Sequence, residues 1–146
     1  MGLLVYQGLL QTELEQLKIT DVNLAGGSVY IKGTPKTNSR ELQQKPKQIM
    51  LFHEYLSQVR PELLKDNERE ALLIGSHQNA ITAEDINKQV TWSFKGLYAP
   101  RRVTCRTIRQ SAITNLLRSE HELRIVQVFA GHKYPSATEK YKQAQL

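Results

Sequence analysis

The sequence predicts an α+β fold that is mainly helical, with a small antiparallel β-sheet near the N-terminus. Over most of the chain, apolar residues recur every three or four positions, which is the period of an amphipathic helix. Near the N-terminus, residues 29–31 and 40–43 instead flank a polar loop that contains Gly33, Pro35 and Asn38, as the two strands of a β-hairpin do. The length of 146 residues and the hydrophobic content of 40% fit one compact domain with its own core.

The remaining helices are placed by their apolar stripes and by end signals. A helix over residues 49–59 should end before Pro61, because proline lacks the N–H that a helix interior needs. Thr82 and Thr104 are N-cap candidates for two further helices, which a basic connector at residues 96–102 joins. The second of these helices should bury an apolar face and leave a polar face that carries Arg106, Arg109 and Gln110. The chain then continues through a helix that ends near Gly131 to a short terminal helix that carries Tyr141.

The charge balance favours a polyanionic partner. The 20 Lys and Arg residues exceed the 14 Asp and Glu residues, which gives a net charge of +6 and favours nucleic acid through phosphate contacts. The single cysteine, Cys105, excludes an internal disulfide, and we expect it to be a small buried side chain. The four histidines show no paired spacing with other ligands, so no metal site is expected. Because the sequence contains no leader and no long apolar run, we expect a soluble, cytoplasmic protein.

Several side chains in this sequence could together act on a phosphodiester. A tyrosine such as Tyr141 can attack phosphorus, remain as a covalent phosphotyrosine and be displaced again by a hydroxyl, without a metal or a cofactor. The transition state needs fixed cations and donors around it, which Arg109, Lys36, His132 and Arg106 could supply. Each residue alone also has a plain structural explanation, such as a solvated helix face for the arginines or a helix cap for the histidine. Tyr141 is moreover one of six tyrosines, most of which must simply pack.

The order of these residues resembles the tyrosine recombinase or phage integrase family, and in particular its C-terminal catalytic domain. The resemblance spans nearly the whole chain. Gly8-Leu9 with Glu13-Leu14 is similar to the first conserved box of that family, and Lys36 falls on its hairpin lysine. Residues 103–111 are similar to the second box. The pattern then closes with Val126-Gln127, Gly131-His132, Thr138 and Tyr141.

The resemblance implies an integrase-like catalytic domain that carries out site-specific DNA recombination through a covalent 3′-phosphotyrosine intermediate, without metal or cofactor. It assigns Tyr141 as the nucleophile, Arg109 as the clamp on the scissile phosphate and Lys36 as the general acid. His132 would be a phosphate ligand or proton carrier, and Arg106 a further cation. The DNA-binding residues expected around this site are Arg40, Arg101, Arg102 and Lys133. The implied partners are double-stranded DNA and other recombinase protomers on that DNA.

The sequence also departs from the family pattern. Leu10 stands where the first box has an arginine, and Arg106 and Gln110 stand where the second box has His-x-x-Arg-His. One alternative is therefore a catalytically impaired DNA-binding relative of integrases, and another is a basic helical interaction module. We read residues 1–146 as an excised catalytic domain without the family's N-terminal DNA-clamping domain. Such a domain should be monomeric and should bind duplex DNA weakly and in a salt-sensitive way.

Overall fold

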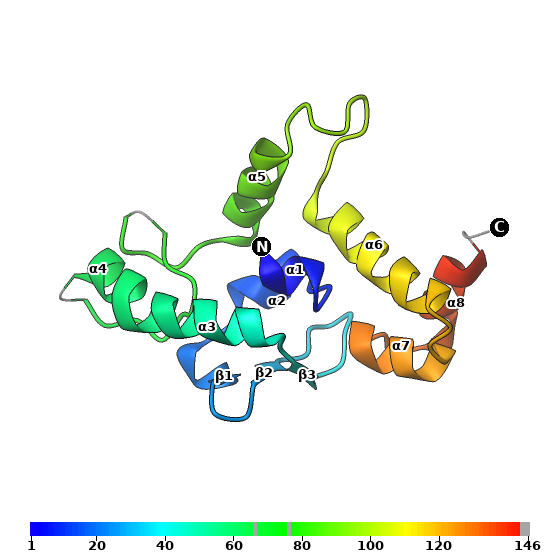
Figure 1. Cartoon of the computed structure of the whole chain (residues 1–146), viewed down its shortest axis with the longest axis horizontal. Coiled ribbons are helices and arrows are strands. Elements are labelled where there is room, and N and C mark those ends of the chain that lie inside the picture. Colours follow the sequence, from blue (N-terminus) through cyan, green and yellow to red (C-terminus); the bar gives the residue numbers. More distant parts are fainter. Residues whose placement is uncertain (66, 76, 144–146) are drawn as a thin grey trace.

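The computed structural model describes residues 1–65, 67–75 and 77–143, which are mainly helical around one small sheet (Figure 1). The predicted fold class is therefore confirmed. The elements of the first half are α1 (Gly2–Val5), α2 (Gln11–Glu15), η1 (Ile19–Asp21), β1 (Val22–Asn23), β2 (Ser28–Ile31), β3 (Arg40–Gln43), α3 (Pro46–Glu54), η2 (Tyr55–Val59) and α4 (Arg60–Leu64). Those of the second half are α5 (Ala83–Ser93), α6 (Cys105–Arg118), α7 (Leu123–Ala130) and α8 (Pro135–Gln143).

The sheet has the strand order β1-β2-β3 and is antiparallel throughout. β2 and β3 form the predicted hairpin, in which Val29 pairs with Leu42 and Ile31 pairs with Arg40. Successive side chains of a strand point to opposite faces. Along β3 the buried positions are accordingly Arg40 and Leu42, while Glu41 is exposed. The hairpin therefore turns the arginine at the start of β3 toward the core.

The helix that was predicted to end before Pro61 continues past that residue. α3 runs into η2, a π-helical turn in which the N–H of Arg60 donates to the carbonyl of Tyr55, and then into α4. A proline in a helix removes one i→i−4 hydrogen bond and crowds the preceding turn. The wider π-helical turn directly before Pro61 relieves this crowding. Pro61 therefore does not end the helix. The helix changes from α to π in the turn before Pro61 and then continues as an α-helix.

The caps of the two central helices are those predicted. The Thr82 and Thr104 hydroxyls accept the backbone N–H groups of Asp85 and Thr107, respectively, and so begin α5 and α6. α7 ends at Gly131, whose φ of 71° is a left-handed conformation that favours glycine. The connector between α5 and α6 projects at the top of Figure 1, away from the sheet. Within the described residues, none of the helices is both long and apolar enough to cross a lipid bilayer.

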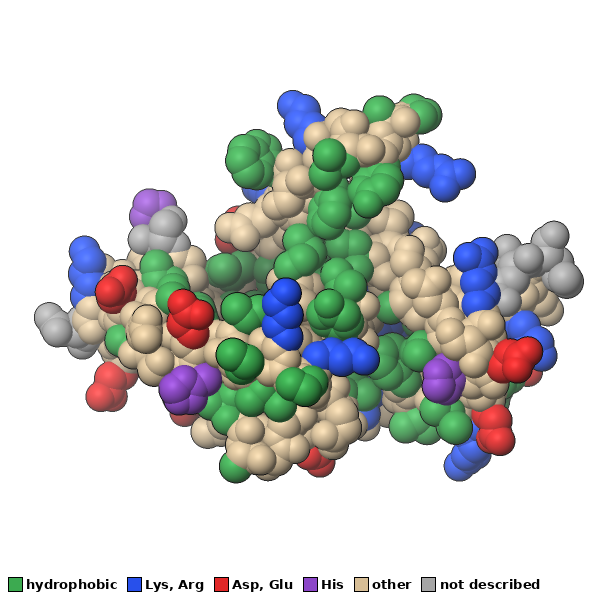
Figure 2. Space-filling model, viewed as in Figure 1, with side chains coloured by type: hydrophobic (Ala, Val, Ile, Leu, Met, Phe, Trp, Pro, Cys, Tyr) green, Lys and Arg blue, Asp and Glu red, His purple; other side chains and the backbone are tan. Residues whose placement is uncertain are grey.

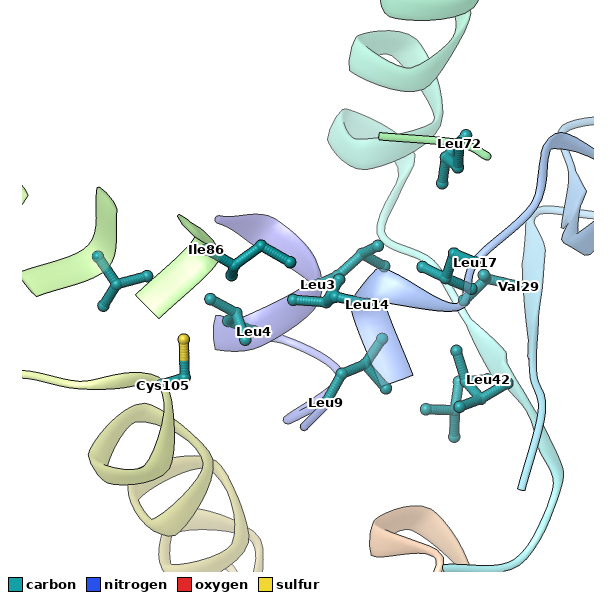
Figure 3. Packing of buried hydrophobic residues seen from close by; sticks show 12 residues of the cluster. Leu3, Leu4, Leu9, Leu14, Leu17, Val29, Leu42, Leu72, Ile86 and Cys105 are labelled. Atoms are coloured by element: carbon teal, nitrogen blue, oxygen red, sulfur yellow. The ribbon is translucent and has the colours of Figure 1, made fainter. Parts of the chain in front are cut away.

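The buried apolar residues form two clusters. The larger one brings together α1, α2, the sheet and α5, and Figure 3 shows its leucines converging from these elements. The smaller one lies between α6 and α7 and consists of Ile113, Val126 and Ala130. An open apolar groove of about 500 Å³ is lined by residues of α1, α3 and α5. Figure 2 shows hydrophobic side chains along this side of the molecule. The smaller cluster is the one that positions the candidate site.

Candidate functional site

The residue that ends α7 lies against the hairpin loop. The carbonyl of Gly131 accepts the N–H of Asn38 at 2.8 Å, and Thr37 forms an isolated antiparallel bridge with His132. A Cβ at Gly131 would lie 2.5 Å from the Nη1 atom of Arg40. Both the backbone conformation and the space therefore require glycine at this position. As a result, the loop that carries Lys36 is fixed to the segment that carries the imidazole.

A buried ion pair supports this junction from below. Glu13 accepts two hydrogen bonds from the Arg40 guanidinium, at 2.7 Å on Oε1 and 3.0 Å on Oε2. The Arg40 and Glu13 side chains are only 3% and 0% exposed. Arg40 Nε also donates to the carbonyl of Phe129 at 2.7 Å, and Thr37 Oγ1 donates to Glu13 Oε1 at 2.8 Å. The pair thus joins α2, β3, the hairpin loop and the last turn of α7.

The electrostatics of this pair favour its charged form. Burial alone raises the pKa of Glu13, but the hydrogen bonds and the positive charge of Arg40 outweigh burial and hold that pKa below its ordinary value. Arg40 was predicted to contact DNA. Its guanidinium is instead buried and bonded to protein acceptors, because residue 40 lies on the core face of β3. In this structure Arg40 is a positioning residue and not a surface cation.

Arg109 is also buried, in contrast to the prediction that it shares the exposed polar face of α6 with Arg106. Its side chain donates to the carbonyl of Gly8 and to the carbonyl of Ala130, each at 2.7 Å. Burial lowers the pKa of Arg109, and the nearby charge of Arg40 lowers it further, whereas Glu13 raises it. A guanidinium has five N–H donors. The two that bind these carbonyls fix the group in place, and the other donors have no partner among the described residues.

His132 is held between α7 and α8. Its Nδ1 atom lies 2.7 Å from the hydroxyl of Thr138, a fully buried residue of α8. Burial is the main cause that lowers the pKa of His132 to about 4, and the charges of Arg109 and Arg40 add to it. The imidazole is therefore neutral near pH 7. If the Thr138 hydroxyl donates to Nδ1, the proton of the ring is on Nε2.

Tyr141 lies directly against this histidine. The two rings are stacked, with centroids 5.9 Å apart and an interplanar angle of 18°. The tyrosine is half-buried and packs on the smaller apolar cluster, with α6 and α7 beneath it. Arg109 interacts electrostatically with both Tyr141 and His132. The structure thus brings together three of the five predicted catalytic residues, on α6, on the segment between α7 and α8, and on α8.

The other predicted residues are on the surface. Lys36 is exposed in a loop that is closed by reciprocal backbone hydrogen bonds between Thr34 and Thr37. Arg106 is exposed on α6, and Lys133 is exposed next to His132. Arg101 and Arg102 are exposed in the connector before α6. Lys36 is distant in sequence from the central cluster, but the backbone of its loop bonds to Gly131 and His132.

Three supporting residues were given no role in the predicted site, namely Glu13, Thr37 and Gly131, although Glu13 and Gly131 belong to the motifs of the family resemblance. The alternation along β3 contained a signal for the first of them, since it places an arginine on the core face, where it needs a buried acidic partner. Leu10 is half-buried, and its N–H donates to Glu13 Oε2 at 2.9 Å. Leu10 stands where the family has a phosphate-binding arginine, and it is the N-cap residue of α2, next to the buried Glu13–Arg40 pair.

The sequence model of the phage integrase family matches residues 1–146. Tyrosine recombinase XerD of Staphylococcus epidermidis is 31% identical over 142 residues, which cover 97% of this chain and 48% of that protein. XerD of Lacticaseibacillus casei is 28% identical over 134 residues, or 92% of this chain and 45% of that protein.

Solved structures agree with this family match. The crystal structure of XerA recombinase superposes with a TM-score of 0.83 at 22% identity, over 96% of this chain and 50% of that chain. XerH site-specific recombinase, crystallised with its difH substrate before cleavage, gives a TM-score of 0.78 at 28% identity, over 97% of this chain and 40% of that chain. The chain spans about half the length of the relatives it matches. From this match over its full length and from its fold, the chain belongs to the phage integrase family.

Proposed function

We propose that this chain is the strand-cleaving domain of a site-specific DNA recombinase and that Tyr141 is its nucleophile. The observation that carries the proposal is the convergence of Tyr141, His132 and Arg109, with the Lys36 loop attached to the same junction. Hydrolytic enzymes also cut phosphodiesters, but a stacked tyrosine beside a buried arginine favours a covalent route. Family membership supports this choice, as does the XerD relatives' name of tyrosine recombinase.

In the proposed reaction, the Tyr141 hydroxyl oxygen attacks the phosphorus of a DNA backbone phosphate. The phosphorus–oxygen bond to the 5′ side breaks, which leaves a 3′-phosphotyrosine and a free 5′ hydroxyl. The phenolic proton leaves to water, and the ammonium group of Lys36 protonates the departing 5′ oxygen. The attack of another 5′ hydroxyl on the phosphotyrosine reverses these steps and joins the strands. The bond energy is conserved in the phosphotyrosine, so no nucleotide is needed.

The other groups stabilise the charge that develops on the non-bridging oxygens. Arg109 is already fixed by two carbonyls, so its remaining donors need no reorganisation when the phosphate arrives. His132 contributes a neutral N–H donor if Nε2 carries the ring proton. Exposed Arg106, Arg101, Arg102 and Lys133 provide a positive surface for the flanking phosphates. The proposed substrate is double-stranded DNA, on which further protomers would assemble.

Leu10 favours a second candidate function, that of a DNA-binding relative with impaired catalysis. A leucine cannot donate to a phosphate, and the loss of one preorganised donor typically slows such a reaction by about a hundred- to a thousandfold. Arg106 is exposed one helical turn from Arg109 and offers a charge, although it comes from a different direction. We favour the active recombinase because the proposed nucleophile, Tyr141, stacks on His132 and interacts with the buried Arg109.

The proposal is tested with a nicked suicide duplex and with an aryl phosphodiester, followed by mass spectrometry of the protein. We expect an adduct on Tyr141 that is absent in Tyr141→Phe. Tyr30→Phe is the matched control, because Tyr30 is an exposed tyrosine on β2. An adduct that forms only in Leu10→Arg would support the impaired relative. The absence of an adduct in the parent protein and in Leu10→Arg would overturn the assignment of Tyr141 as a nucleophile in this chain.

We further propose that the chain is the catalytic domain of a longer cytoplasmic recombinase and that it is monomeric when isolated. The coverage of the XerD relatives supports the first part, because the chain matches 48% of their length. Its weak and salt-sensitive binding to duplex DNA is expected because it offers one basic surface and not a clamp around the duplex. Sedimentation at low and high salt, with and without duplex, tests the monomeric state and the salt dependence of DNA binding. A stable dimer without DNA would contradict the monomeric state.

A further inference from the structure

The positive charge of this protein is concentrated in one stretch of the chain. Residues 86–119 contain seven Lys and Arg residues and no Asp or Glu, whereas the rest of the chain has 13 Lys and Arg against 14 Asp and Glu. These seven cations are Lys88, Lys95, Arg101, Arg102, Arg106, Arg109 and Arg118. The net positive charge of the protein therefore lies in this stretch, which includes most of α5, the connector and the whole of α6. A partner that binds here must be anionic.

The connector also exposes large apolar side chains. We call residues 92–102 the arm, which includes the last turn of α5 and the connector that projects in Figure 1. Each of residues 95–102 is exposed. Trp92 is 78% exposed, Leu97 is 69% exposed and Tyr98 is 59% exposed. Large apolar groups exposed on one projecting segment indicate a contact surface, because so little of their area is buried in the protein.

The cations of the arm are not neutralised by the protein. Lys95, Arg101 and Arg102 form no ion pair with any described residue, whereas Lys88, on the preceding turns of α5, pairs with Glu84 at 2.9 Å. Tyr98, Arg101 and Arg102 line an open groove of about 650 Å³, and Arg118 of α6 lines the same groove. Figure 2 shows Lys and Arg side chains on both sides of the projecting part, with apolar side chains between them. The ring of Tyr98 and the unpaired cations Arg101 and Arg102 thus share one groove, and Trp92 and Lys95 are exposed on the same arm.

We propose that the arm binds unpaired bases of a DNA strand, with Trp92 and Tyr98 stacking on bases and Lys95, Arg101 and Arg102 contacting the phosphates. This inference rests on the proposed function, because strand exchange must separate base pairs next to the cut. An aromatic ring meets only the edges of bases in an intact duplex, whereas an unpaired base offers its whole face. The absence of acidic residues from residues 86–119 argues against a second copy of this surface as the partner, since like charges repel.

Trp92 makes the proposal directly measurable, because it is the only tryptophan of the chain. Its fluorescence is recorded while the 146-residue protein is titrated with three DNAs of equal length: a single strand, an intact duplex and a duplex with a central mismatched bubble. We expect quenching by the single strand and by the bubble, and much weaker quenching by the intact duplex. Equal or stronger quenching by the duplex would overturn the inference.

Variants separate stacking from charge. With fluorescently labelled single strands, Trp92→Ala should weaken binding roughly 5- to 150-fold, whereas Trp92→Phe should retain most of the affinity, since stacking is worth about 1–3 kcal/mol per base. Removal of Lys95, Arg101 or Arg102 should reduce the slope of log K against log salt by about 0.7 for each cation. Tyr30→Ala and Lys47→Ala are the matched controls, because both residues are exposed and lie outside the arm.

The outcomes also separate this inference from the proposed function. Formation of an adduct on Tyr141 with a small aryl phosphodiester does not require the arm. An adduct without Trp92 quenching would overturn only the arm inference, while quenching without an adduct would overturn only the nucleophile. Equal quenching by an acidic polypeptide such as polyglutamate would identify the arm as a surface for acidic proteins and would contradict base stacking.

Discussion

The removal of Glu13 should destabilise the protein far more than an ordinary polar substitution. Glu13→Ala leaves the Arg40 guanidinium buried, without its two carboxylate acceptors. Breaking a buried pair in this way typically costs about 3–5 kcal/mol, compared with a total domain stability of roughly 5–15 kcal/mol. The carboxylate also accepts from the Thr37 hydroxyl and from the N–H of Leu10, so these donors lose a partner as well. We therefore expect a large fraction of the folding free energy to be lost.

The measurement is urea unfolding followed by far-UV circular dichroism. Glu13→Gln keeps the size and one acceptor oxygen, and so isolates the contribution of the charge. In the double variant with Arg40→Met, the loss should be smaller than the sum of the two single losses by roughly 1–3 kcal/mol, as expected for residues in direct contact. A loss below about 1 kcal/mol for Glu13→Ala, or strictly additive single effects, would refute the view that this pair holds the junction together.

The same pair predicts the acid limb of the stability curve. The pKa of Glu13 is lower in the folded protein than its ordinary value of 4.5. The unfolded chain therefore binds the proton more readily, and the stabilisation is complete above pH 4.5 and is lost as the pH falls through the folded pKa. The double variant should lack this contribution. The N–H of Asn38 donates to the carbonyl of Gly131, and its hydrogen exchange should become faster in Glu13→Ala at every pH.

Three further outcomes follow from the site. Gly131→Ala should cost at least about 1–3 kcal/mol in urea unfolding, because φ is 71° and the new Cβ would meet Arg40, and an unchanged midpoint would contradict this account. An NMR titration of His132 should give a pKa of about 4; since this lies below the ordinary 6.5, His132 should make stability fall as the pH drops from 6.5 to 4, and a pKa near 6.5 would show that the ring is solvated. Leu10→Arg should speed adduct formation on Tyr141 by about a hundred- to a thousandfold, whereas Leu10→Met, which adds no donor, should not, and equal rates in all three proteins would place residue 10 outside the phosphate site.

Local signals were sufficient for most of the fold. The Thr82 and Thr104 caps, the β2–β3 hairpin and the end of α7 at Gly131 depend on interactions within a few residues, which a single sequence displays. The helix across Pro61 was missed because its outcome depends on whether the preceding turn widens. A proline signal fixes the loss of one hydrogen bond but does not decide how the backbone compensates for it.

The site was less predictable where burial decides the role of a charge. Arg40 was predicted to contact DNA and Arg109 was predicted to lie on the exposed face of α6, but both guanidiniums are buried and bonded to protein oxygens. Their acceptors include the Phe129 and Ala130 carbonyls at the end of α7, and Arg40 and Phe129 are 89 positions apart in sequence. No local pattern in the chain reveals such a pairing. The alternation along β3 does place Arg40 inward, so this part of the error was avoidable.

The two buried arginines explain how a site can keep its geometry after the loss of one phosphate ligand. Arg40 and Arg109 bind successive carbonyls at the end of α7, where the helix dipole is negative, and so hold the segment that leads to His132. Neither interaction involves the side chain of Leu10, which contributes only its N–H to Glu13. A change at position 10 therefore removes a donor without disturbing the support beneath His132 and Tyr141. For this reason the return of an arginine at that position tests the chemistry of the site separately from its folding.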